Sequence, residues 1–381
     1  MLAILCLFLH TVAALSLLQD VVLQRIEANL ARGPRPAWVI GTQLEAVTEL
    51  HYPQSSGFGK APFSSAGPTP TTVVDLARSV VIQRDGSGLL VPGSRAASDT
   101  ASIGTGVILA SFYGSEPKAS YSQPWLIPAT APVGSSAWFM RAAYDQMEFL
   151  LTKVQRTPSG IISHAQNNLQ IWSDAGYMHP TFMAYYAVAT GNRTIMEMAI
   201  EQAVLIHDAL VDEQGTYRHI LGGPNEDRGH WSTGTGWSVA GIVRIMATIQ
   251  HSPWSNALST QTAILTKMAT KVLAAAWSNA LPSGALMNYP DNAESDFADA
   301  ASTALIASAT FRLAALTTVS NSLLDSAEKG RSFVQSQIDA DGWLTQVVNP
   351  VSIRALGERS PEAQAFVLLM TAAHRDLHHQ D

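Results

Sequence analysis

Cysteine, charged residues and long β-forming runs are all scarce in this sequence. The 381 residues include one cysteine and only 14% charged residues, with a formal net charge of -7. Such a chain offers no basic face to a nucleic acid, so we expect no partner of that kind. The hydrophobic share of 47% excludes a disordered chain and is sufficient for a large core with a wide pocket.

The N-terminal segment is a short apolar run that predicts a signal peptide over residues 1–16. Ala13, Ala14 and Ser16 provide a cleavage region, although no Lys or Arg precedes the run. The run is too short to cross a bilayer and no second one follows, so we expect a secreted, extracellular protein without membrane contact. A buried N-terminal helix is the alternative. Because Cys6 lies in this segment, the mature chain can form no disulfide, cysteine-ligated zinc site or thiol nucleophile.

Helical spacing dominates the rest of the chain. From Phe297, apolar residues recur at Ala301, Ala304, Leu305 and Phe311, as expected for the buried stripe of a helix. Alternating runs of β-branched residues are scarce, so we expect few strands. The predicted helices lie near 17–33, 37–51, 71–83, 101–113, 133–156, 172–190, 193–212, 231–250, 257–278, 295–316, 320–338 and 361–377.

These helices, joined by alternating short and long loops, predict an all-α fold, an (α/α)6 barrel of six helical hairpins. The stretch 51–71 is rich in Gly, Pro and Ser, and a long loop over one domain fits it better than an interdomain linker. We therefore expect residues 17–381 to form a single catalytic domain. The long loops of such a barrel gather at one end as a funnel, where function is expected.

One chemically rich segment combines Ser163–Ala165 with Ile171–Pro180, at a predicted junction of loop and helix. It contains an indole, a carboxylate, a tyrosine and two histidines. Asp174 stands where a helix N-cap would accept backbone N–H groups, which is the structural interpretation. The catalytic interpretation is that Trp172 offers an apolar plate to a sugar. Burial against such a plate can raise a carboxyl pKa toward acid/base use.

A second segment, Tyr217–Trp237, is rich in glycine and contains Trp231 and Trp237. Glycines let a backbone pass close to a ligand, and indole rings can stack on sugar faces. The alternative is a tight turn whose tryptophans fill the barrel interior. Both interpretations place this segment beside the funnel.

Motifs for common cofactors and metals are missing. The glycine spacing is not a dinucleotide fingerprint, and no P-loop, H-E-x-x-H or G-x-S-x-G motif occurs. Three histidines near the C-terminus, His374, His378 and His379, belong to a metal-ligating residue type, but a frayed and solvated chain end is the preferred interpretation. We therefore expect no metal and no cofactor.

The two segments resemble the unsaturated rhamnogalacturonyl hydrolases of glycoside hydrolase family 105, which are related to the unsaturated glucuronyl hydrolases. The resemblance extends from about Ala96 to the C-terminus and is strongest over 157–250. It implies an (α/α)6 barrel, in agreement with the helix count. The residues that carry it are Trp172, Ser173, Asp174, Tyr177, Met178, Pro180, Gly191, Asn192, His219 and the runs Trp231–Trp237, Asp299–Ala304 and Ser360–Phe366.

The resemblance implies a substrate with a 4,5-unsaturated uronic acid at its non-reducing end, as lyases leave on pectin (rhamnogalacturonan) fragments. One aspartate protonates C4 and activates water for attack on C5, whereas ordinary glycosidases need a spaced carboxyl pair. By position, Asp174 matches this aspartate. We expect a monomer whose partner is the oligosaccharide. Its other contacts are predicted at His164, Trp172, Tyr177, Met178, His219, Arg228, Trp231, Thr233 and Trp237.

One motif departs from the family pattern W-x-R-G-N-G-W, because Thr233 stands where the arginine belongs. This loss removes a planar cation from a site for an anionic sugar, and Arg228 is a possible replacement. One alternative that follows is a non-catalytic sugar-binding relative. A second, independent alternative keeps the barrel and is a two-carboxylate glycosidase or lyase acting on a saturated sugar. The second alternative requires another acid facing Asp174. The candidates are Asp227, Asp296 and Asp299.

Overall fold

The computed structural model describes residues 20–379 except 33–34, 61, 66 and 293–295, so the predicted signal peptide lies outside the described residues. Residues 20–30 are helical. None of the described helices is long and apolar enough to span a membrane. The remaining helices are α2 Ala37–His51, α3 Thr71–Val81, α4 Ala97–Ser102, α5 Gly104–Tyr113, α6 Ser136–Thr152, α7 Ala175–Thr190, α8 Arg193–Leu210, α9 Ser232–Gln250, α10 Ser259–Ser278, α11 Ala300–Leu316, α12 Asn321–Ser336 and α13 Pro361–His378.

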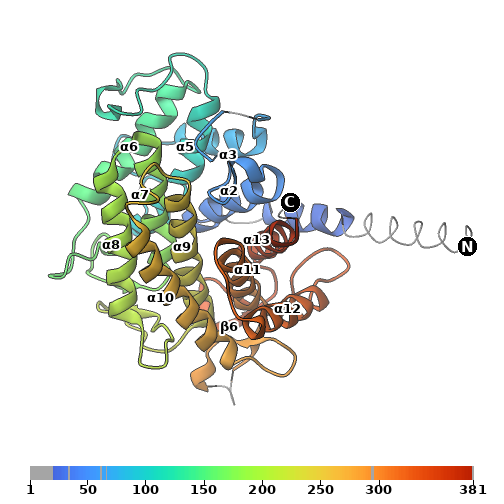
Figure 1. Ribbon diagram of the computed structural model, residues 1–381. Helices are drawn as coiled ribbons and strands as arrows, with labels where there is room; N and C mark the ends of the chain where they lie inside the picture. Colours follow the sequence, from blue (N-terminus) through green and yellow to red (C-terminus); the bar gives the residue numbers. More distant parts are fainter. Residues whose placement is uncertain (1–19, 33–34, 61, 66, 293–295, 380–381) are drawn as a thin grey trace, which may run out of the picture.

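Six helical segments form a closed inner ring. Around the ring they are α2, α4 with α5, α7, α9, α11 and α13, and each contacts the next, with α13 returning to α2. The helix at 20–30 and helices α3, α6, α8, α10 and α12 each precede one inner segment along the chain and lie outside the ring (Figure 1). The predicted (α/α)6 barrel of six hairpins is therefore confirmed.

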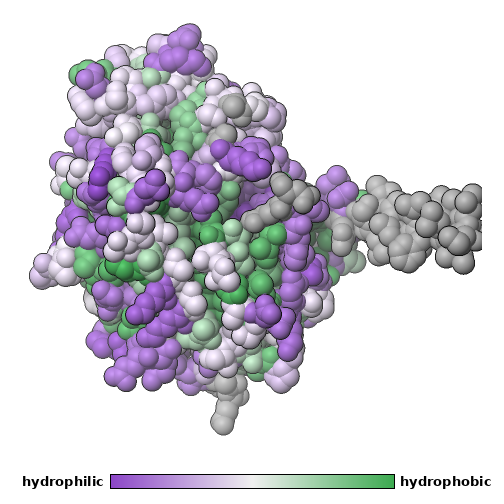
Figure 2. Space-filling model, in the orientation of Figure 1, coloured by the Kyte–Doolittle hydropathy of each residue, from purple (hydrophilic) through white to green (hydrophobic). Residues whose placement is uncertain are grey.

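Burial distinguishes the inner helices from the outer ones. Every residue of α9 from Ser232 to Ile249 is buried, whereas the buried residues of outer α12 follow a single stripe of helical spacing. Gly241 lets α9 approach α7, because a Cβ there would lie 2.0 Å from the carbonyl oxygen of Gly176. On the face seen in Figure 2, hydrophobic side chains show mainly toward the middle.

Three short antiparallel ladders lie in the loops and explain why some helices differ from their predicted bounds. The pairs are β1 Ile171–Trp172 with β2 Ile220–Leu221, β3 Leu286–Met287 with β4 Ala298–Asp299, and β5 Val347–Asn349 with β6 Ser352–Gly357. Because β1 and β4 are extended, the helices predicted from 172 and 295 begin only at Ala175 and Ala300. The helix predicted over 101–113 begins at Ala97 and is interrupted at Ile103. The β1–β2 pair also joins the two chemically rich segments.

A buried ion cluster ties the C-terminal halves of four inner helices together. Arg244 of α9 donates to Glu45 and Glu49 of α2. Arg312 of α11 donates to Glu49 and, at 2.7 Å, to Asp376 of α13. Buried charges are tolerated only when they are paired in this way. The cluster marks one end of the inner ring, and the helices begin at the other.

Candidate active site

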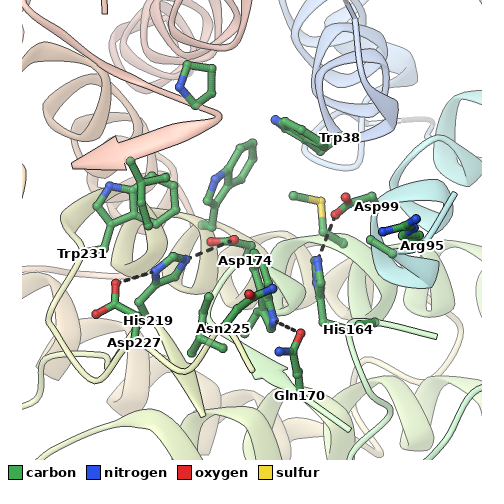
Figure 3. A pocket seen from close by; sticks show the side chains of 18 of the residues that line it. Trp38, Arg95, Asp99, His164, Gln170, Asp174, His219, Asn225, Asp227 and Trp231 are labelled. Atoms are coloured by element: carbon green, nitrogen blue, oxygen red, sulfur yellow. Dashed lines mark hydrogen bonds and ion pairs between the residues drawn. The ribbon is translucent and has the colours of Figure 1, made fainter. Parts of the chain in front are cut away.

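A cavity of about 710 Å³ lies where the inner helices begin. Residues at the starts of five inner segments line it, namely Trp38 of α2, Asp99 of α4, Asp174 before α7, Trp231 before α9 and Glu362 of α13 (Figure 3). Its volume is typical of a small-molecule site. The positive ends of the helix dipoles also converge here, which favours negatively charged groups in the cavity.

Asp174 directs its carboxylate away from its own helix. Its backbone angles, φ -59° and ψ -34°, are already helical, and its side chain accepts no hydrogen bond from the first turn of α7. A capping side chain reaches the first turn from an extended backbone, so the capping interpretation is wrong. The carboxylate instead accepts a bond from Ser173 Oγ at 3.4 Å and lies 3.7 Å from His219 Nε2. It is thus available to a ligand in the cavity.

His219 connects Asp174 to a second carboxylate, that of Asp227. Its Nδ1 lies 3.1 Å from Asp227 Oδ2, and the hydroxyl of Tyr289 donates to the same oxygen at 2.6 Å. Burial by itself lowers the pKa of His219, but the neighbouring carboxylates of Asp174 and Asp227 outweigh burial and raise the pKa. Burial likewise disfavours ionised Asp227, yet bonds from His219, Tyr289 and the Gly229 amide lower its pKa. A positive imidazole is therefore favoured beside Asp174.

His164 lies on the other side of Asp174 and is electrically different (Figure 3). Its ring stacks on Trp172 with 4.4 Å between centroids and 11° between planes. Its Nε2 lies 3.5 Å from Asp99 Oδ1. Burial lowers the pKa of His164 to about 4, despite the charge of Asp174, so this ring is neutral at neutral pH. The stacked pair forms a flat wall against which a sugar can lie.

Two carboxyl groups near Asp174 have raised pKa values. Burial, followed by the charge of Asp174, raises the pKa of Asp99 well above its ordinary value. Burial raises the pKa of Glu362 to about 8, against the opposing hydrogen bond from the Trp38 indole. That bond joins Trp38 Nε1 to Glu362 Oε2 at 3.3 Å. The cavity is therefore less negative at neutral pH than its acidic residues suggest.

The structure brings most of the predicted site residues together around the cavity. Tyr177, Arg228 and Thr233 lie elsewhere. Tyr177 is buried behind the wall, Arg228 is exposed and pairs with Glu226 at 2.7 Å, and Thr233 is buried and donates to Asp299 Oδ2 at 3.1 Å. Thr233 thus belongs to the cap of α11. The predicted residues that line the cavity are His164, Trp172, Asp174, Met178, His219, Trp231 and Trp237.

The three acids considered as partners of Asp174 all have local bonds. Asp227 lies behind His219 (Figure 3), and Asp296 accepts two neighbouring backbone N–H groups. Asp299 caps α11. The carboxyl groups that line the cavity with Asp174 and Asp227 are instead those of Asp99 and Glu362.

Sequence reasoning did not assign Asp99, Glu362, Trp38 or Arg95 to the site, although Glu362 lies in the run Ser360–Phe366 that carries the family resemblance. That run was the signal for Glu362, whereas Asp99 lies ahead of the helix predicted over 101–113 and had none. Arg95 lies in a loop and carries no such signal. It is the only lysine or arginine among the described residues of the cavity wall.

The closed ring of hairpins and its acidic, indole-walled cavity define a carbohydrate-active enzyme of the helical-barrel class. Residues 134–364 match the pattern of Glycosyl Hydrolase Family 88. Because this match covers more than half of the chain, the protein belongs to that family and is a glycoside hydrolase. None of the curated protein sequences matches this chain.

Several solved structures share the fold at low sequence identity. A possible member of the GH105 family from Salmonella enterica is 16% identical, with a TM-score of 0.71 over 95% of this chain and 94% of that one. A family 105 glycoside hydrolase from C. acetobutylicum is 14% identical, with a TM-score of 0.67 over 93% and 98%. An unsaturated glucuronyl hydrolase from Bacillus sp. GL1, described as responsible for glycosaminoglycan degradation, is 13% identical, with a TM-score of 0.61 over 91% and 88%.

Proposed function

We propose that this protein removes a 4,5-unsaturated uronic acid from the non-reducing end of oligosaccharides left by polysaccharide lyases, with pectin (rhamnogalacturonan) fragments as the substrate class. The observation that carries the proposal is the uncapped carboxylate of Asp174 in the cavity, 3.7 Å from His219 Nε2. A single carboxyl group in such a place can give and take a proton in turn.

In the first step, protonated Asp174 transfers its proton to C4 of the enol ether, and positive charge develops at C5 and the ring oxygen. The aspartate is then ionised, and the neighbouring imidazolium of His219 stabilises it. Asp227 accepts the other ring N–H and sets the orientation of the imidazole.

In the second step, ionised Asp174 takes a proton from water as the water oxygen bonds to C5. The resulting hemiketal opens at the bond between C5 and the ring oxygen, which leaves a ketone at C5 and a hemiacetal at C1. Loss of the neighbouring sugar as an alcohol from C1 yields an aldehyde. One water is consumed, and Asp174 is protonated again for the next cycle.

Charge in the cavity supports a uronate over a neutral sugar. The positive ends of the inner helices face the cavity, and the Glu362 pKa of about 8 leaves this acid mostly neutral at neutral pH, which reduces the repulsion that an anion would meet. The raised pKa of Asp99 acts in the same direction. The exposed Arg95 is the cation of the wall, and we assign to it the carboxylate of the sugar, the task that the family arginine at the Thr233 position would otherwise perform. The leader predicted at residues 1–16 supports secretion toward extracellular polysaccharide.

The test is incubation of the purified protein with lyase-digested rhamnogalacturonan while the ultraviolet absorbance of the double bond is followed. We expect the absorbance to fall as a free sugar appears. Saturated oligosaccharides from the same polymer are the control and should remain intact. Cleavage of the saturated set alone would support the two-carboxylate glycosidase, and calorimetric binding without turnover would support the non-catalytic relative. Lyase-digested glycosaminoglycan, run in parallel, decides which polymer supplies the substrate.

A further inference from the structure

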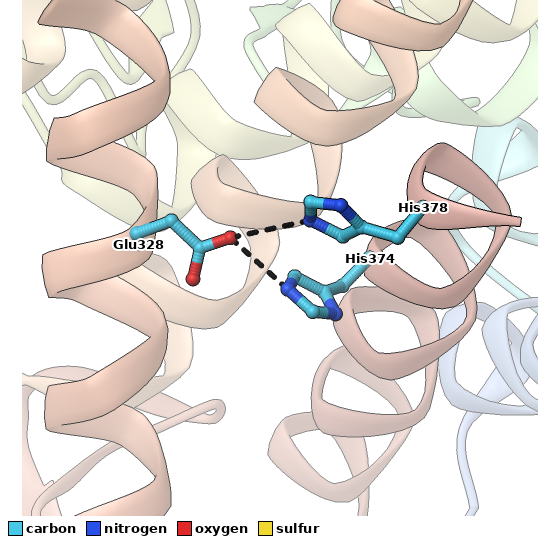
Figure 4. A group of neighbouring side chains, drawn as sticks. All are labelled: Glu328, His374 and His378. Atoms are coloured by element: carbon cyan, nitrogen blue, oxygen red, sulfur yellow. Dashed lines mark ion pairs between the residues drawn. The ribbon is translucent and has the colours of Figure 1, made fainter.

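Two of the three histidines near the C-terminus, His374 and His378, face the neighbouring helix α12. Helix α13 continues to His378, so the interpretation of His374 and His378 as a frayed end is wrong. His374 Nε2 lies 3.0 Å from Glu328 Oε1 of α12, and His378 Nε2 lies 3.7 Å from the same oxygen (Figure 4). The two imidazoles point toward one carboxylate from successive turns of α13, because residues four apart share a helix face.

The spacing of these three atoms suits a transition-metal ion. One ligand atom from each of Glu328, His374 and His378 lies within 4.8 Å of the others. A tetrahedral zinc ion bound at about 2.0–2.1 Å holds neighbouring ligand atoms roughly 3.3 Å apart. The two distances of 3.0 and 3.7 Å lie on either side of that value, so small side-chain rotations are enough to admit the ion.

The surroundings prepare the ligands for a metal. Arg331 Nε binds the other oxygen of Glu328 at 2.8 Å and so holds the carboxylate while leaving Oε1 toward the histidines. The ring of Phe311 meets His374 edge-on at 5.2 Å between centroids.

We propose that Glu328 Oε1, His374 Nε2 and His378 Nε2 bind one divalent transition-metal ion of the zinc type. Two imidazoles and one carboxylate, with water in the fourth position, form a donor set that zinc accepts. The ion would join the end of α13 to α12. The site is far from the cavity, since His374 follows the cavity residue Glu362 by three turns of α13, about 18 Å. Metal binding and sugar hydrolysis are therefore separable.

The experiment is a zinc titration of the full chain without any histidine tag, followed by calorimetry. We expect one ion per chain with a dissociation constant in the micromolar range. His374→Ala and His378→Ala should each weaken binding at least tenfold, because each removes one of three protein ligands. His379→Ala is the matched control, since this neighbouring histidine is exposed at the helix end, and it should bind zinc like the unmodified chain.

A second measurement does not depend on heats of binding. Zinc should raise the melting temperature of the unmodified chain and of His379→Ala, and it should do so much less in His378→Ala, whose exposed side chain is not required for folding. Equal zinc binding by all variants, or no binding by the unmodified chain at millimolar zinc, would overturn the proposal. His378→Ala should hydrolyse sugar normally. Failure of the zinc proposal would therefore leave the proposed hydrolase function untouched, and failure of that function would leave the zinc result untouched.

Discussion

Asp174 and Asp299 occupy the same position relative to their helices and have opposite surroundings. Each is the residue before an inner helix. Asp299 has an extended backbone, φ -108° and ψ 112°, and its carboxylate accepts from the Ala301 and Ser302 amides of its own helix. It is fully buried, and it also accepts from the Val348 amide. Asp174 has a helical backbone, its carboxylate makes no capping bond, and its side chain lines the cavity.

The comparison teaches that the backbone angle at a helix start decides what an aspartate does. The extended residue turns its carboxylate back to the unpaired amides, so its hydrogen-bonding capacity is used within the fold. The helical residue directs its carboxylate outward, and its capacity is left for a ligand. Five experiments break or sharpen this comparison, in order of expected effect.

Asp174→Asn should reduce turnover of unsaturated oligosaccharides by about 10³-fold or more, because an amide can neither give nor take the proton. The melting temperature should change little, since the carboxylate makes one long bond to Ser173 and a 3.7 Å ion pair with His219, whose imidazole keeps Asp227 as its closer partner. Ultraviolet absorbance and thermal unfolding measure the two effects. Full activity in this variant would remove Asp174 from the mechanism.

Asp299→Ala should show the opposite pattern. It removes a cap and leaves the Val348 amide and the Thr233 hydroxyl without their acceptor, so we expect the free energy of unfolding to fall by about 3 kcal/mol. Denaturant titration measures this loss. Turnover by the folded fraction should stay within a few-fold of the unmodified enzyme, and a collapse of turnover at unchanged stability would contradict the structural role.

Arg95→Gln tests the charge that accompanies Asp174 in the cavity. If Arg95 holds the sugar carboxylate, KM should rise about tenfold while kcat changes little, because binding is lost before and during reaction alike. Arg228→Gln is the matched control, since that exposed arginine pairs with Glu226 outside the cavity. Equal KM values for both variants would contradict the assignment of Arg95 to the sugar carboxylate.

Thr233→Val tests whether this position belongs with Asp299 or with the sugar. The substitution keeps the side-chain volume and removes one buried hydrogen bond, so we expect a loss of about 1 kcal/mol in the free energy of unfolding. KM should not change. A rise in KM as large as that of Arg95→Gln would show that Thr233 takes part in sugar binding.

Glu362→Gln tests the protonated acid beside Asp174. The pKa of about 8 in the folded state exceeds the ordinary value of 4.5, so the folded chain keeps a proton that the unfolded chain loses. This contribution to stability is complete below about pH 4.5 and decreases as the pH rises toward 8. The variant lacks this pH dependence. The melting temperature of the variant minus that of the unmodified enzyme should therefore be a few degrees larger at pH 8 than at pH 5. An unchanged difference would show that Glu362 is ionised.

Local sequence pattern predicted the helices and the two segments that meet at the cavity. The stripe from Phe297 is a property of neighbouring residues, and its members in α11 are buried, although all the other residues from Ala300 to Leu313 are buried as well. The association of indole and carboxylate around Trp172 and Asp174 was likewise visible, because these residues are adjacent in the chain. Thr233 was misplaced because its position in a motif does not reveal which way its side chain points.

The sequence by itself determined the helical spacing and the approximate positions of the helices, since these depend on residues three and four apart along one chain segment. Only the tertiary structure decided which helix starts share a cavity. Closure of α13 on α2 brings Glu362 to Trp38, and contact of α4 with α7 brings Asp99 toward Asp174. It also decided the raised pKa values of Glu362 and Asp99, because pKa shifts arise from burial and from charges on distant parts of the chain.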